Sequence, residues 1–139
     1  MNTLTIEPTI LDKSDGNLYL APHLLVDGIQ LANFSSFAVD MVELRKSLLR
    51  SGDYFILTCW CGEPSCMGIE AGIRVTHEGF LVRWHLQDPF DDSTYEFSLP
   101  QLKSEFESSL NSIRAARDQA IASESKPIKI VPRVSKDVL

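Results

Sequence analysis

The chain has 139 residues, the length of one ordinary domain, and 44% of them are hydrophobic. Its seven glycines and seven prolines exclude the collagen, low-complexity and strongly disordered classes. The formal net charge of −6 argues against a general binder of nucleic acid or of acidic membranes.

Three features of the sequence favour the cytoplasm. No apolar run approaches the roughly 18 residues that a membrane-spanning helix needs. The opening MNTLTIEPTILDK lacks a basic region followed by an apolar one, so no secretory signal is visible. Three cysteines are too few for a disulfide framework, which suits a reducing compartment.

Charge is unevenly distributed along the chain. Residues 51–100 contain eight acidic residues and only two basic ones, Arg74 and Arg83, whereas residues 101–139 contain seven basic and five acidic residues. No internal repeat or long linker divides the chain. We therefore expect one domain over residues 1–124 with an acidic middle, followed by a tail over residues 125–139.

The first predicted elements are a short strand and a helix. Residues 18–20 follow a turn signal and predict a strand, which Pro22 interrupts before a second turn at Asp27-Gly28. A helix is predicted over residues 37–50. Ser35 and Ser36 are its candidate caps, Ser51-Gly52 ends it, and its apolar stripe consists of Met41, Leu44 and Leu48.

The central part of the chain predicts an antiparallel sheet. Residues 54–61 are apolar on both faces and indicate a central strand. Residues 71–77 and 80–86 alternate in polarity, and a turn at Glu78-Gly79 brings every apolar residue to one side. The pairs expected from this register are His77 with Phe80, Val75 with Val82, Ile73 with Trp84, and Ala71 with Leu86.

The last predicted elements are a strand over residues 94–97 and a helix over residues 99–122. Ser98 and Gln101 have the spacing of a helix cap, and an apolar stripe continues for about seven turns. The tail, with its two prolines, could be an edge strand or frayed. The fold class expected is α+β, an antiparallel sheet with two packed helices.

One cluster carries suggestive chemistry. Cys59, Cys61 and Cys66 lie within eight residues with a glycine and a proline between them, which resembles half of a zinc knuckle. The expected hairpin places His77 about 20 Å from the cysteines at 3.3 Å per residue. His85 returns toward them and is the better candidate for a fourth ligand.

Two other interpretations of the cysteines stay open. Cys59 and Cys61 share a strand face with apolar residues, and free cysteine often packs as a small buried hydrophobe. This packing role is preferred to metal binding. A pair of reactive or redox thiols is the third interpretation, and no neighbouring Lys or Arg in the sequence would lower a thiol pKa.

The hairpin also carries basic residues. Arg74, Arg83 and His85 are expected on one of its faces, where they could hold an anion. The abundant acidic residues around them favour a solvated, screened face instead.

A resemblance follows from the string TCWCGEPSCMGI, the later Trp84 and the segment YEFSLPQLKSEF. Together they resemble a set of small bacterial proteins that share a strand ending in C-x-C-G-x3-C, a tryptophan on a later strand and a C-terminal helix. The likeness covers residues 54–110. It implies a fold module and a bacterial origin, and no particular reaction.

We therefore expect a non-enzymatic interaction module that binds a basic protein partner, in the manner of small acidic immunity proteins by analogy of size and charge. The sequence contains no nucleophile elbow, phosphate-binding glycine loop or paired catalytic carboxylates. The first alternative is a zinc-stabilised module that uses Cys59, Cys61, Cys66 and His85. The second is an enzyme with a reactive thiol.

Overall fold

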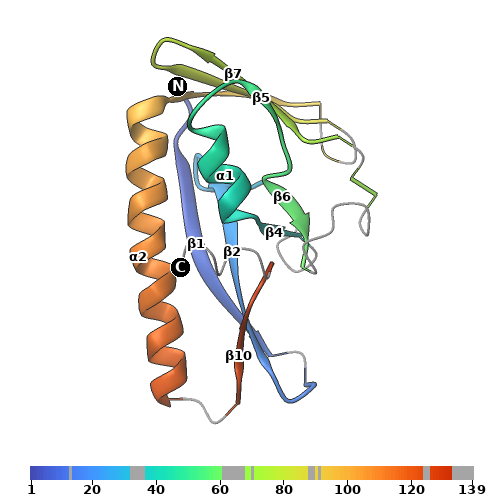
Figure 1. Ribbon diagram of the computed structural model, residues 1–139, viewed down its shortest axis with the longest axis vertical. Coiled ribbons are helices and arrows are strands. Elements are labelled where there is room, and N and C mark those ends of the chain that lie inside the picture. The colour runs from blue at the N-terminus through green and yellow to red at the C-terminus, as the bar shows by residue number, and fades with distance from the viewer. Residues whose placement is uncertain are drawn as a thin grey trace.

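The computed structural model describes residues 1–12, 14–31, 37–60, 68–69, 71–87, 90, 92–123 and 126–132. It confirms the expected α+β architecture, with antiparallel sheets and two helices, of which the longer packs along a sheet (Figure 1). Within the described residues the strands form three sheets rather than one. None of the helices in this part of the chain is both long and apolar enough to cross a membrane.

The first sheet is built on a long antiparallel pair, β1 (Leu4–Asp12) and β2 (Leu18–Val26). The short β3 (Ile29–Gln30) pairs with one end of β2, and β10 (Ile128–Ile130) pairs in parallel with the other. The tail therefore contributes an edge strand over these three residues. No strand was predicted over the residues of β1.

Strand β2 continues through Pro22, although an interruption was predicted there. Leu20 O and Leu24 O accept hydrogen bonds from Val131 N and Leu31 N, on the side of β2 away from β1. Pro22 lies two residues from both Leu20 and Leu24, and alternate residues of a strand direct their backbone groups to the same side. Its nitrogen therefore points into the gap between β10 and β3. The missing N–H therefore costs no ladder hydrogen bond.

The first helix, α1 (Met41–Ser47), is shorter than predicted and begins later. Residues 37–39 form a strand, β4 (Phe37–Val39), which pairs with β6 (Leu57–Cys59). The observed cap is Asp40, and the predicted caps Ser35 and Ser36 lie outside the described residues. Pairing with a distant strand overrides the local helical stripe here.

The predicted central strand over residues 54–61 was also wrong. The chain forms β5 (Gly52–Tyr54), leaves that sheet at Phe55 and Ile56, and then forms β6. Phe55 N donates to Glu43 Oε1 and Ile56 O accepts from Asp40 N. These contacts with α1 and its cap satisfy the backbone where the ladder is broken.

The third sheet has the order β5, β7 (Ile73–Glu78), β8 (Leu81–His85) and β9 (Thr94–Ser98). Its central hairpin differs from the predicted register by two residues, since Val75 faces Trp84 and Glu78 faces Leu81. The turn residues are Gly79 and Phe80, and Gly79 has a φ of 60°. A two-residue turn with glycine first avoids the positive φ that the predicted turn would have imposed on Glu78. A shift of two preserves the faces, so Ile73 and Trp84 are both buried as expected.

The second helix, α2 (Leu99–Ser123), matches the prediction closely, and Ser98 Oγ accepts a hydrogen bond from Gln101 N at its start. Its apolar stripe packs into one core with residues of β1, β2, α1 and the third sheet. The buried side chains of α2 in that core are Leu102, Phe106, Leu110 and Ile113.

Side chains of α2 also bind the free edge of β1. Gln101 Oε1 accepts from Leu4 N at 3.2 Å while Gln101 Nε2 donates to Leu4 O at 2.8 Å. One turn later Glu105 Oε1 accepts from Ile6 N at 2.8 Å. The helix therefore supplies the hydrogen bonds that a neighbouring strand would otherwise make.

Candidate functional site

The thiol cluster is only partly described. Cys59 ends β6, faces Phe37 on β4, and is a half-buried free thiol. Cys61 and Cys66 lie outside the described residues. Packing, metal binding and thiol reactivity at this cluster therefore stay predictions.

The proposed fourth ligand, His85, lies on β8 in the third sheet, whereas Cys59 belongs to the β4–β6 pair. His85 Nε2 is 2.7 Å from Asp92 Oδ1, and the cross-strand neighbour of His85 is Arg74. Among the described residues no group of three or more His, Cys, Asp or Glu side chains could hold a metal ion.

The basic face of the hairpin is paired with carboxylates. Arg74 lies 3.2 Å from Asp53 on the neighbouring strand β5. Arg83 lies 3.7 Å from Glu78 and 3.5 Å from Glu96, on the strands to either side. These pairs satisfy the arginines within the sheet and leave little free charge for an anion, as the screened-face interpretation predicted.

A polar constellation that the sequence did not reveal lies on the outer face of β1 and β2. His23 Nδ1 is 2.6 Å from Thr9 Oγ1, and His23 Nε2 is 3.7 Å from Glu7 Oε2. Burial lowers the pKa of His23, and the nearby Glu7 carboxylate opposes that shift. The ring is therefore held neutral and cross-links the two strands near neutral pH.

A hollow bounded by described residues lies between the end of α1 and the first turns of α2. We call it the α1–α2 groove, and its volume is about 330 Å³. Its lining consists of Arg45, Leu48, Leu49, Lys103, Phe106 and Glu107. Leu48 and Phe106 are buried and form its apolar floor, whereas Leu49 is 76% exposed.

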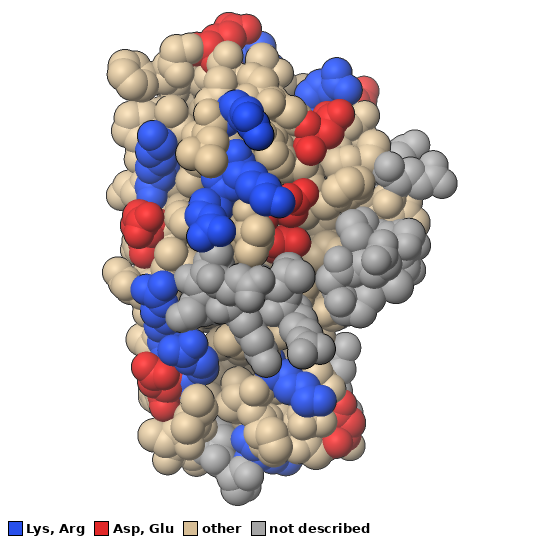
Figure 2. All heavy atoms as spheres, viewed as in Figure 1, with Lys and Arg blue, Asp and Glu red and all other residues tan. Residues whose placement is uncertain are grey.

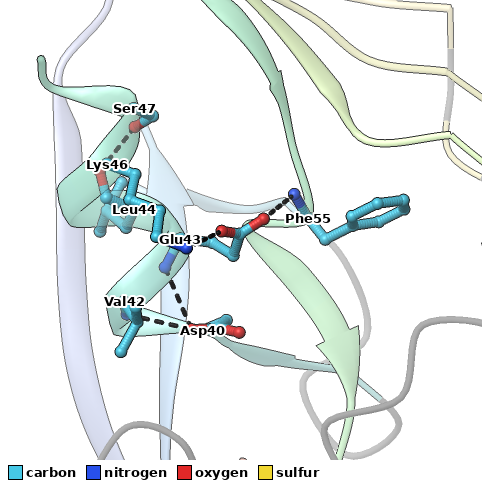
Figure 3. A network of polar contacts seen from close by, with 7 residues as sticks. All are labelled: Asp40, Val42, Glu43, Leu44, Lys46, Ser47 and Phe55. Atoms are coloured by element: carbon cyan, nitrogen blue, oxygen red, sulfur yellow. Dashed lines mark hydrogen bonds and ion pairs between the residues drawn. The ribbon is translucent and has the colours of Figure 1, made fainter. Parts of the chain in front are cut away.

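A network of polar contacts fixes the orientation of α1 (Figure 3). Asp40 Oδ1 accepts from Val42 N at 3.0 Å and from Glu43 N at 3.1 Å. Burial raises the pKa of Asp40, although these two N–H groups oppose the shift. Glu43 joins the helix to the β5–β6 connection through Phe55 N at 3.0 Å. The groove wall formed by α1 is thus held at the start of the helix and on its flank.

Four exposed cations surround the groove or adjoin it in the chain, namely Arg45, Lys46, Arg50 and Lys103, which we call the basic cluster. Figure 2 shows Lys and Arg side chains gathered on this face of the molecule. Lys46 lies 3.5 Å from Glu43. The side chains of the other three form no hydrogen bond or ion pair with the part of the chain that the structure describes. Lys103 lies more than fifty residues after the other three cations in the sequence, so charge counting along the chain did not reveal the cluster.

Comparison of the chain with known protein families, with curated proteins and with solved structures found no match.

Proposed function

We propose that the protein is a non-enzymatic interaction module that binds another macromolecule through the α1–α2 groove. The observation that carries this proposal is the exposed Leu49 beside an apolar floor, bordered by cations without partners among the described residues. An apolar centre with a charged rim is the usual organisation of a protein–protein interface, and arginine is enriched there.

The basic partner expected from the sequence is a second candidate, and it would use a different surface. The net charge of −6 and the acid-rich middle of the chain support it. The described acids of this middle already face basic side chains, Asp53, Glu78 and Glu96 beside arginines and Asp92 beside His85. This contact would therefore use the other acids, among them Glu63, Glu70 and Asp88. Those three residues lie outside the described part of the chain.

The two candidates differ in how a charge reversal affects association. For a basic partner, reversing Glu63, Glu70 and Asp88 should slow association, and raising salt from about 50 to 300 mM should weaken it because exposed charges are screened. For a partner in the groove, the same reversals should leave association unchanged.

Site-specific photo-crosslinking tests the groove. A photoreactive phenylalanine analogue would replace Leu49 in one chain and Phe80 in another, because both side chains are 76% exposed. We expect a discrete adduct with one protein from position 49 in cells that express the chain at its native level, and no such adduct from position 80. Absence of an adduct at position 49, or the same adducts from both positions, would contradict the proposal.

A matched pair of variants supplies an independent measurement with the partner so identified. Leu49→Ser should reduce its recovery with the purified chain, whereas Phe80→Ser should not. Both substitutions replace exposed side chains, and each should change the free energy of unfolding by less than about 0.5 kcal/mol.

A further inference from the structure

We infer that the α1–α2 groove binds a short acidic amphipathic segment of a protein partner. In this arrangement an apolar side chain of the segment lies on Leu48 and Phe106, and its carboxylates face Arg45, Arg50 and Lys103. The inference rests on the proposed function and adds the chemistry of the partner.

The two walls of the groove share one helical spacing. On one wall Arg45, in the last turn of α1, is followed at i+3 and i+4 by Leu48, the C-cap, and Leu49, in the turn after the helix. On α2, Lys103, Phe106 and Glu107 have the same spacing. Residues three and four apart lie on the same side of a helix. Each wall therefore presents one cation beside apolar surface, Arg45 on one side and Lys103 on the other, and the α2 wall also carries the carboxylate of Glu107.

The size of the groove favours an anchor side chain over a complete small ligand. Its 330 Å³ lie at the lower end of the roughly 300–1,000 Å³ typical of small-molecule sites. An amphipathic helix that docks by its apolar face uses a few anchors at i, i+3 or i+4 and i+7. Leu49, exposed at the margin, extends the apolar contact beyond the floor.

The charge distribution favours a protein segment over a membrane or a nucleic acid. The basic cluster contains four cations with Glu43 and Glu107 beside them, and the whole chain is negative. An extended polyanionic surface meets the repulsion of the whole molecule. A segment with two or three carboxylates mainly experiences the charges within about 10 Å, because salt screens the rest.

Peptide selection on the full chain tests the inference without knowledge of the natural partner. A random 15-residue display library would be selected on the folded chain, and single clones would then be compared by fluorescence anisotropy. We expect enriched peptides with a net charge of −2 or lower and apolar residues at helical spacing. Their affinity should fall about tenfold for Arg45→Glu/Lys103→Glu, since two attractions become repulsions.

Lys129→Glu is the matched control, because Lys129 is an exposed cation on β10, away from the groove. It should leave peptide affinity unchanged. If the double reversal unfolds the chain, Arg45→Gln/Lys103→Gln keeps the test valid with a smaller expected loss of about threefold.

Three outcomes would overturn the inference. The selection could yield no binders, or it could yield neutral or basic peptides. It could also yield acidic peptides that bind the Arg45→Glu/Lys103→Glu variant as tightly as the unchanged chain. Tighter binding to vesicles with 30% phosphatidylserine than to any selected peptide would also overturn it, in favour of a membrane. A crosslink from position 49 to a segment that is not acidic would reject this inference and leave the proposed function intact.

Discussion

Two charged regions of this molecule differ in how their cations are neutralised. On the third sheet, Arg74 and Arg83 each lie within 4 Å of a carboxylate on an adjacent strand. Around the α1–α2 groove, Arg45, Arg50 and Lys103 of the basic cluster make no ion pair with the described residues. Figure 2 shows that this face of the molecule is rich in exposed cations.

The difference shows that charge counted along a sequence does not give the charge of a surface. Strand pairing in the sheet brings both arginines of the acidic middle within 4 Å of carboxylates that lie 5 to 21 positions away in the sequence, so these two cations are neutralised within the sheet. Packing of α2 beside α1 instead brings together cations from two distant segments. The excess charge is therefore positive on this face of a chain that is negative overall.

The largest loss of stability is expected from a substitution in the core on which both charged regions are packed. Phe106 is 4% exposed, forms the floor of the groove, and packs into the core that contains Val82 and Trp84 of the sheet. Phe106→Ala should lower the free energy of unfolding by about 3–5 kcal/mol through lost burial and a residual cavity. Denaturant titration followed by circular dichroism measures it, and a loss below about 1 kcal/mol would show that the two regions do not share a tightly packed core.

A smaller loss of stability is expected from substitution of Asp40, the N-cap that positions α1. Asp40→Ala removes the acceptor of two N–H groups and should cost about 1–2 kcal/mol. Asp40→Asn keeps an acceptor and removes a carboxylate that burial disfavours, so its cost should stay below about 0.5 kcal/mol at pH 7. Because the pKa of Asp40 is raised in the folded state, the penalty of its ionised form is present at neutral pH and disappears as pH falls through the folded pKa. Equal losses in both variants, measured by thermal melting, would contradict this account.

The thiol cluster supplies a prediction outside both charged regions. If Cys59 is a packing residue, Cys59→Ala should cost about 1 kcal/mol and the purified chain should contain no stoichiometric metal. If the cysteines bind zinc, a chelator should lower the melting temperature sharply, because metal-binding free energy is part of folding free energy. Elemental analysis after dialysis separates the two cases, and about one zinc per chain would overturn the packing role.

The smallest changes in the free energy of unfolding are expected when a paired arginine and an unpaired one are each replaced. Arg83→Gln should cost at most about 1 kcal/mol, and the loss should shrink in 1 M salt because its partners are exposed carboxylates. Arg45→Gln should change the free energy of unfolding by less than about 0.3 kcal/mol at either salt concentration. Parallel urea titrations measure both, and a salt-dependent loss in Arg45→Gln would show that the cluster is compensated after all.

Local patterns predicted the elements that owe little to distant partners. The stripe of α2, its Ser98 cap and the alternation in β7 and β8 are all read within a few residues, and each was confirmed. The predicted hairpin register was wrong by two residues because it placed Glu78 at the first position of the turn. That position requires a positive φ, which Gly79 adopts more easily.

The remaining errors arose where distant residues decide local structure. Residues 37–39 join a strand because residues 57–59 lie beside them, and Phe55 leaves its sheet because Glu43 accepts its N–H. The groove depends in the same way on α1 and α2, which are separated by about fifty residues. No pattern within either segment indicated that the other would lie opposite.

The hydrogen bonds from Gln101 and Glu105 to the edge of β1 have a consequence for synthesis of the chain. The β1–β2 hairpin is a local structure that can form as soon as its residues leave the ribosome, whereas the groups that cover its edge lie 97 and 99 positions further along. Until those positions emerge, the nascent hairpin presents unpaired N–H and C=O groups at Leu4 and Ile6 to neighbouring chains. Pro8, which has no N–H to offer, is placed where it limits how far a foreign strand could extend along that edge.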